Sequence, residues 1–143
     1  MDILLREIEH YCLISIDTPL LANLNMIENI ALIPEVHKHI SVQKAQELAQ
    51  NCLAKIEKED ISLKRMHQLN EVEIFYVLIA RALMDARQTI VIVNPLSILK
   101  HVEFLAIAMK NLAILNEEKN IIILENDINR FHYEGMWVFN GIQ

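Results

Sequence analysis

Glycine is almost absent from this sequence of 143 residues. Only Gly135 and Gly141 occur, and both lie near the C-terminal end. A P-loop and a dinucleotide-binding fingerprint each need several closely spaced glycines, because the backbone must approach the phosphates without intervening side chains. Neither motif can therefore exist within these 143 residues.

Cysteines, long apolar runs and excess basic charge are also lacking. Cys12 and Cys52 are too few for a disulfide framework and follow no charged-then-apolar leader, so we expect a reduced, cytoplasmic protein. No apolar run approaches the roughly 18 to 20 residues that span a bilayer, so any membrane contact is expected to go through a partner. The net charge of −6 argues against a nucleic-acid partner.

The residues that are present favour one well-packed domain. Hydrophobic residues make up 53% of the chain, and 143 residues are enough to bury a sizeable core. We therefore expect residues 1–143 to form a single domain.

The most informative stretch is residues 69–95. Asn70 is a good N-cap and Glu73 stands three positions later, as in a capping box. From residue 72 to residue 84 the apolar side chains wrap nearly all round the predicted helix, which indicates burial on most sides. The β-branched run at 89–93 then predicts a strand covered on both faces, ended by Asn94-Pro95. This pattern predicts an α/β fold with a mostly parallel sheet between two layers of helices.

The remaining elements follow from periodicity. We expect strands at 11–16, 121–124 and 136–139, and a polar loop after Pro34. Residues 102–116 predict a largely apolar helix. Ser41 is a reasonable N-cap for a helix at 42–55, which carries a one-sided apolar stripe. The stripe consists of Val42, Ala45, Leu48, Ala49, Cys52, Leu53 and Ile56.

Several ordered motifs carry a family resemblance. The sequence IARAL stands at 79–83, preceded by LNEVE at 69–73 and followed by a strand ending Val93-Asn94-Pro95, and NDIN stands at 126–129. In this order they resemble the nucleotide-binding domains of ABC transporters, especially the cell-division and lipid-transport branches. The resemblance implies a truncated P-loop NTPase-like core that starts near the family's second core strand. It also implies a small helical subdomain, roughly residues 25–75, inserted in the α/β core.

The resemblance preserves the scaffold and not the chemistry. Glu71 and Val72 stand where the family has its signature glycines, and Asn126 stands where it has the switch histidine. Val93 replaces the aspartate that organises Mg²⁺, and Asn94 replaces the glutamate that polarises water. An amide cannot take a proton from water, and an added carboxylate repels phosphate. We therefore expect no catalytic residue and no bound cofactor. The remnants of the nucleotide site would be Asn70, Glu71, Glu73, Asn94 and Asn126.

Residues 17–32 resemble the family stretch that follows the Q-loop and docks on the transporter. Ile16 stands where the family has its nucleotide-sensing glutamine. The resemblance implies a docking surface for an ABC-type ATPase, a permease subunit or a second copy of this chain. Its candidate residues are Asp17, Leu20, Leu21 and Glu28.

In the family, the P-loop strand lies between the strands matched here by 121–124 and 136–139. An unpaired strand edge is an aggregation hazard. We therefore expect 136–139 to pair directly beside 121–124, or a second chain to add a strand there. Residues 1–10 are a third candidate to fill the gap.

Other chemistries find less support. His37 and His39 lack a third ligand, so we expect no metal site. A catalytic triad of Ser97, Asp127 and His132 is poorly supported, because no glycine-flanked nucleophile turn surrounds the serine.

Two functions remain. The leading interpretation is a catalytically inactive ABC-ATPase-like subunit that acts as a binding or regulatory module. The alternative is a nucleotide-dependent subunit whose composite site is completed by a partner's P-loop. An unrelated three-layer α/β domain would explain the packing pattern equally well.

Overall fold

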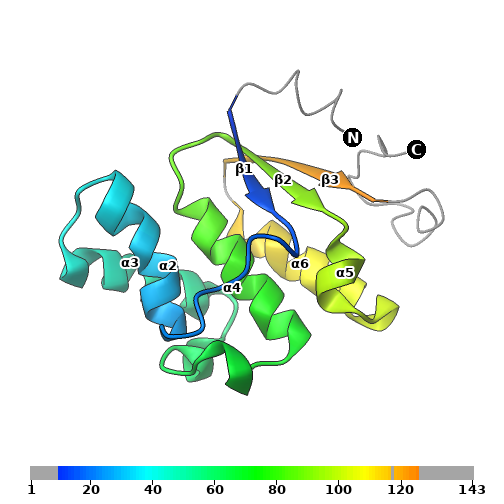
Figure 1. The fold of residues 1–143 in the computed structure, drawn as a ribbon, viewed down its shortest axis with the longest axis horizontal. Coiled ribbons are helices and arrows are strands. Elements are labelled where there is room, and N and C mark those ends of the chain that lie inside the picture. The colour runs from blue at the N-terminus through cyan, green and yellow to red at the C-terminus, as the bar shows by residue number, and fades with distance from the viewer. Residues whose placement is uncertain (1–9, 117, 126–143) are drawn as a thin grey trace.

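A computed structural model of the chain describes residues 10–116 and 118–125 (Figure 1). Its centre is a parallel sheet of three strands in the order β1-β2-β3, with bounds Tyr11–Ile14, Thr89–Val93 and Asn120–Leu124. The strand predicted at 89–93 is confirmed. β1 ends before the predicted residue 16 because Ser15 begins a turn, in which the Thr18 amide donates to the Ser15 carbonyl at 3.1 Å.

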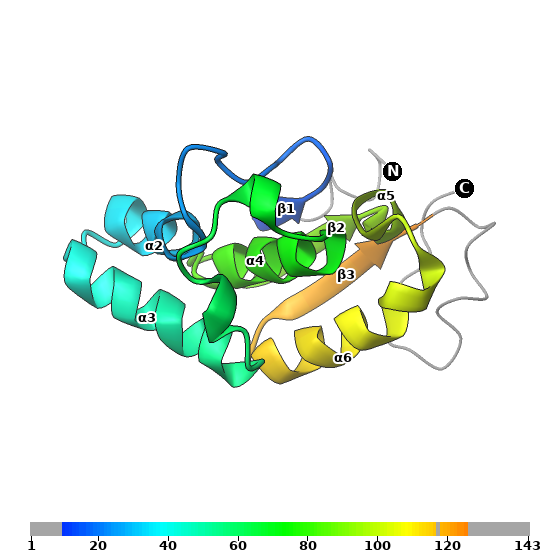
Figure 2. The same ribbon diagram turned by 90° about the horizontal axis from the view of Figure 1, so that it is seen from below.

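Within the described residues, five α-helices and three short 3-10 helices connect and cover the strands. α4 and α6 run beneath the sheet, and α2 and α3 lie together to one side (Figures 1 and 2). None of the described helices is long and apolar enough to cross a bilayer. The bounds are α2 Met26–His37, α3 Val42–Lys55, α4 Glu71–Leu83, α5 Pro95–Leu99, α6 Leu105–Leu115, η1 Glu59–Ile61, η2 Met66–Gln68 and η3 Val102–Phe104.

The described helices share one apolar core with one face of the sheet. Ile14, Ile92 and Ile123 belong to that core, whereas Val91 and Leu124 point to the opposite face and form a smaller cluster. Strands with buried apolar residues on both faces fit the predicted α/β class. The predicted strand at 136–139, its pairing beside β3 and the role of residues 1–10 lie outside the described residues.

α4 is built as its sequence predicts. The Asn70 side chain accepts from the Glu73 amide at 2.9 Å, and the Glu73 carboxylate accepts from the Asn70 amide at 3.1 Å. This reciprocal capping box satisfies donors that the first turn would otherwise leave unpaired. Every residue from 75 to 80 is buried, and the Tyr76 hydroxyl accepts from the Asn111 side-chain amide at 2.7 Å.

Three details differ from the sequence prediction. α2 passes through buried Pro34 and ends at His37, where a polar loop was expected. Proline disfavours a helix interior because it lacks an N–H, but packing overrides this preference and the Pro34 carbonyl still accepts from Lys38. Val42 and Leu48 of the predicted stripe are exposed, because α3 buries a narrower face centred on its alanines. The predicted helix at 102–116 begins as η3 and becomes α-helical only at 105.

We expect the substitution Ile79→Asp to unfold the protein. Ile79 is 0% exposed in the middle of α4, and an unpaired buried carboxylate costs several kcal/mol against a total stability of roughly 5 to 15. Glu71→Ala is the matched control, since Glu71 is only half-buried and takes no part in the capping box. Thermal melts followed by circular dichroism compare the two. A more stable Ile79→Asp than Glu71→Ala would show that the account of α4 is wrong.

Candidate functional site

The carboxyl end of the sheet is where parallel α/β folds bind ligands. Asn94 directly follows β2 and adopts a left-handed conformation, with φ 49° and ψ 62°. Its amide donates to the Leu124 carbonyl at 2.7 Å, which ties the ends of β2 and β3 together. Its side-chain oxygen Oδ1 is buried and accepts no hydrogen bond from the described residues. The Asn94 side chain stands where the resemblance places the catalytic glutamate.

A carboxylate reaches the same edge from β3. Glu125 follows the last residue of β3, is 4% exposed, and accepts from the Leu96 amide of α5 at 3.4 Å. The sequence analysis left Glu125 out of the site. A carboxylate directly after a buried strand was the signal that could have identified it. Asn126, the predicted switch remnant, lies outside the described residues.

The other predicted remnants stand at the start of α4, away from the strand ends (Figure 1). The side chains of Asn70 and Glu73 bond each other's backbone amides, so the capping box already uses them. Glu71 occupies the first position of the helix and is half-buried. Carboxylates near a helix N-terminus are favourable for the helix, and they also repel an incoming phosphate.

The predicted docking residues lie on and beside the loop that leads from β1 to α2. Asp17 is exposed and Leu21 is 43% exposed, whereas Leu20 is buried in the core. The Glu28 carboxylate accepts from the Asn25 amide at 3.0 Å in the capping box of α2. Leu20 and Glu28 therefore hold the loop in place instead of forming its outer surface. Ile16, at 66% exposure, is exposed on the same loop as Asp17 and Leu21.

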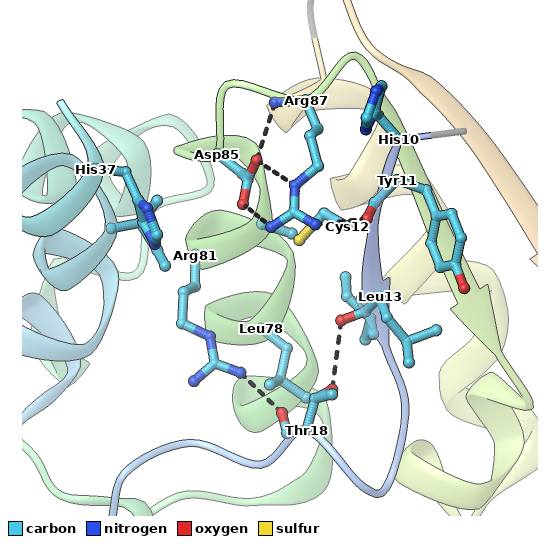
Figure 3. A pocket seen from close by; sticks show the side chains of 13 residues that line it. His10, Tyr11, Cys12, Leu13, Thr18, His37, Leu78, Arg81, Asp85 and Arg87 are labelled. Carbon is cyan, nitrogen blue, oxygen red and sulfur yellow. Dashed lines mark hydrogen bonds and ion pairs between the residues drawn. The ribbon is translucent and has the colours of Figure 1, made fainter. Parts of the chain in front are cut away.

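Two side chains that sequence reasoning missed fix the shape of this loop. Asn29 is 0% exposed, and its amide oxygen accepts from the Leu21 amide at 2.8 Å while its nitrogen donates to the Leu21 carbonyl at 3.1 Å. Arg81 of α4 donates to the Thr18 carbonyl at 2.7 Å (Figure 3). It also donates to the Pro19 carbonyl at 3.0 Å. A lone amide in the apolar run of α2 was the signal for Asn29. The contacts of Arg81 leave no local pattern, because their partners lie more than 60 positions away.

A second anchor joins the end of α4 to β1. The Arg87 guanidinium donates twice to the Asp85 carboxylate, at 2.9 and 3.0 Å, and once to the Tyr11 carbonyl at 2.9 Å (Figure 3). Burial alone would raise the pKa of Asp85, but the hydrogen bonds and charge of Arg87 outweigh it and hold that pKa below its usual value. The pair therefore stays ionised at neutral pH and fastens α4 to the sheet edge.

Comparison with known proteins identifies the fold. Two solved structures of the ATP-binding cassette MJ0796, described as a dimeric bacterial ABC transporter cassette, match with a TM-score of 0.64 and 26% identity. One of them holds ADP and phosphate. Each match covers 90% of this chain and 58% of the cassette, so the chain spans little more than half the length of these relatives. No protein-family model matches the sequence, and no curated protein does.

These matches define the class. The chain is an α/β domain with the core fold of ABC-transporter ATPase cassettes, within the P-loop NTPase class. More particularly, the chain resembles the cassette MJ0796 over 90% of its own length.

We expect the backbone at Asn94 to decide which substitutions this edge tolerates. Asn94→Val places a β-branched side chain in the left-handed region and should destabilise the fold by about 1–2 kcal/mol. Asn94→Gly should change stability by less than about 1 kcal/mol, because glycine adopts this conformation freely. Urea unfolding measures both. Equal stability of the two variants would contradict a strained turn at the end of β2.

Proposed function

We propose that this chain is a catalytically inactive ABC-ATPase-like subunit that acts as a binding or regulatory module. The observation that carries the proposal is the pair Val93-Asn94 at the end of β2. Valine offers no oxygen to a magnesium ion, and an amide cannot act as a general base. The scaffold around the pair is intact, with Asn94 tied to β3 through Leu124.

The start of α4 supports the same conclusion. In the family, as the resemblance implies, signature glycine amides hold the γ-phosphate across a dimer. Glu71 and Val72 give these positions side chains here, and Glu71 adds negative charge. Asn70 and Glu73 are bound to each other, so phosphate contact would require the capping box to break. The helix start therefore serves stability at the expense of nucleotide affinity.

The partners we propose are an ABC-type ATPase, a permease subunit or a second copy of this chain. Ile16, Asp17 and Leu21 offer an exposed apolar surface with one charge, held rigid from below by Asn29 and Arg81. A preorganised loop binds with less loss of conformational entropy than a flexible one. Both similar structures are dimers, which favours an assembly with another cassette-like chain. We propose a cytoplasmic location, with any membrane contact made through the partner.

One observation favours a second function, a composite nucleotide site completed by a partner's P-loop. Glu125 brings a buried carboxylate to the edge where the Asn94 side-chain oxygen accepts no hydrogen bond from the described residues. A partner that supplies the phosphate-binding loop would find polar groups already in place there. This function requires nucleotide binding by the complex and none by the chain alone.

We expect calorimetric titration of the 143-residue chain with Mg-ATP to give no saturable heat. The P-loop that carries most phosphate affinity is absent from these residues, so any Kd should exceed about 1 mM. A cassette with intact motifs is the positive control. Micromolar binding by the chain alone would contradict an inactive subunit. Binding that occurs only after a copurifying P-loop ATPase is added would favour the composite site.

The loop surface can be tested by copurification from native cells. We expect the double variant Ile16→Asp, Leu21→Asp to lose its ABC-type partner while keeping its fold, because both side chains are exposed and charges exclude an apolar partner. Ile107→Asp is the matched control, since Ile107 is an exposed apolar residue on α6. Mass spectrometry identifies the bound subunits. Retention of the partner by the double variant, or its loss in the control, would place the interface elsewhere.

A further inference from the structure

A cavity of about 560 Å³ lies between β1, α2 and α4, and Asn94 and Glu125 are not among its lining residues (Figure 3). We refer to it as the β1 cavity. Its volume is that of a small-molecule site. Basic and imidazole side chains enter it from several elements: His37 and Arg81 lie on one side, and His10 and Arg87 on the other. Asp85 is the only carboxylate among its described lining residues.

Arg81 brings to the cavity a positive charge that no carboxylate in the described part of the chain pairs with. The charge of Arg87 is matched by its bidentate contact with Asp85. Among the described residues, by contrast, the acceptors of Arg81 are the carbonyls of Thr18 and Pro19, and no carboxylate pairs with it. Burial lowers the pKa of the Arg81 guanidinium, which shows that its positive charge is poorly solvated. A guanidinium has five N–H donors, so three remain for a ligand.

We propose that the β1 cavity binds a small organic anion, a carboxylate or a phosphate ester, with its charged group on Arg81 and its carbon skeleton against the apolar wall. Leu78, Ala82 and Ile33 provide that wall. Planar bidentate donation to carboxylate or phosphate is the geometry that arginine supplies best. His37, the last residue of α2, also lines the cavity and offers an imidazole donor (Figure 3).

The edge of β1 argues for a small ligand over an added strand from a partner. β1 is an outer strand of the described sheet, and strand addition would require its free carbonyls. The Tyr11 carbonyl already accepts from Arg87 at 2.9 Å, and the Leu13 carbonyl accepts from the Thr18 hydroxyl at 3.4 Å. These contacts block the edge and leave the cavity beside it. This inference is independent of the proposed function, because the cavity contains none of the nucleotide-site remnants.

The test is an NMR titration of the ¹⁵N-labelled 143-residue chain with acetate, hexanoate and inorganic phosphate at constant ionic strength. We expect saturable shifts at the Arg81 Nε–H and at the amides of Cys12 and Arg87. Hexanoate should bind at least about fourfold more tightly than acetate, the gain from burying one CH₂ group. Saturation by hexanoate alone assigns a carboxylate ligand, and saturation by phosphate alone assigns a phosphate ester. Either result supports the proposal.

Variants separate the site from general charge effects. Arg81→Gln should weaken binding at least about tenfold, since it removes charged hydrogen bonds. His37→Ala should weaken it about two- to tenfold and, because His37 is exposed, it should do so without disturbing the loop that Arg81 anchors. Lys110→Gln, on the exposed face of α6, removes the same charge outside the cavity and should bind as the wild type does. Shifts that stay linear to about 20 mM for all three probes, or equal weakening by Lys110→Gln, would overturn the proposal.

Discussion

The burial of α4 against the sheet is the constraint on which the rest of this structure depends. The helix is apolar on nearly all sides, and it contacts α2, α3, α5, α6 and β1. Its C-terminal end leads through Asp85 and Arg87 into β2, and Arg87 returns to bond β1. Because the same helix carries Arg81, its position also sets the loop from β1 to α2. A shift of α4 would therefore disturb the core, the sheet edge and the loop together.

Local signals in the sequence predicted most of the fold. The capping box at Asn70 and Glu73 and the β-branched run at 89–93 each need only neighbouring residues, and both are confirmed. Pro34 misled the prediction because its local preference against helix interiors was weaker than the packing of α2 on α3 and α4. The exposure of Leu48 was missed for a related reason, since periodicity gives a face of α3 but not its width.

The candidate site was less predictable because its contacts join residues far apart in the chain. Arg81 reaches Thr18 across 63 positions, and Glu125 reaches Leu96 across 29. An arginine at position 81 and a glutamate at position 125 do not indicate, from the sequence alone, which distant residue each of them contacts. Asn94 was predicted from the family resemblance. Its left-handed backbone was not predicted, and neither was its buried side-chain oxygen, which has no partner within the described part of the chain. Family motifs thus locate a site, whereas only the fold shows which side chains are already occupied.

Because the core and the candidate site use different residues, the scaffold can persist while the chemistry of the site changes. Core positions such as Phe75, Ile79 and Ile90 select for apolar volume, and substitution there costs the fold directly. Asn94 and Glu71 are only half-buried, so they can replace other residues with little effect on the packing of the core. Arg81 both stabilises the fold and lines the β1 cavity. Two of its five N–H donors hold the loop, and the side chain also lines the β1 cavity, so the proposed ligand would use donors other than those that bind Thr18 and Pro19.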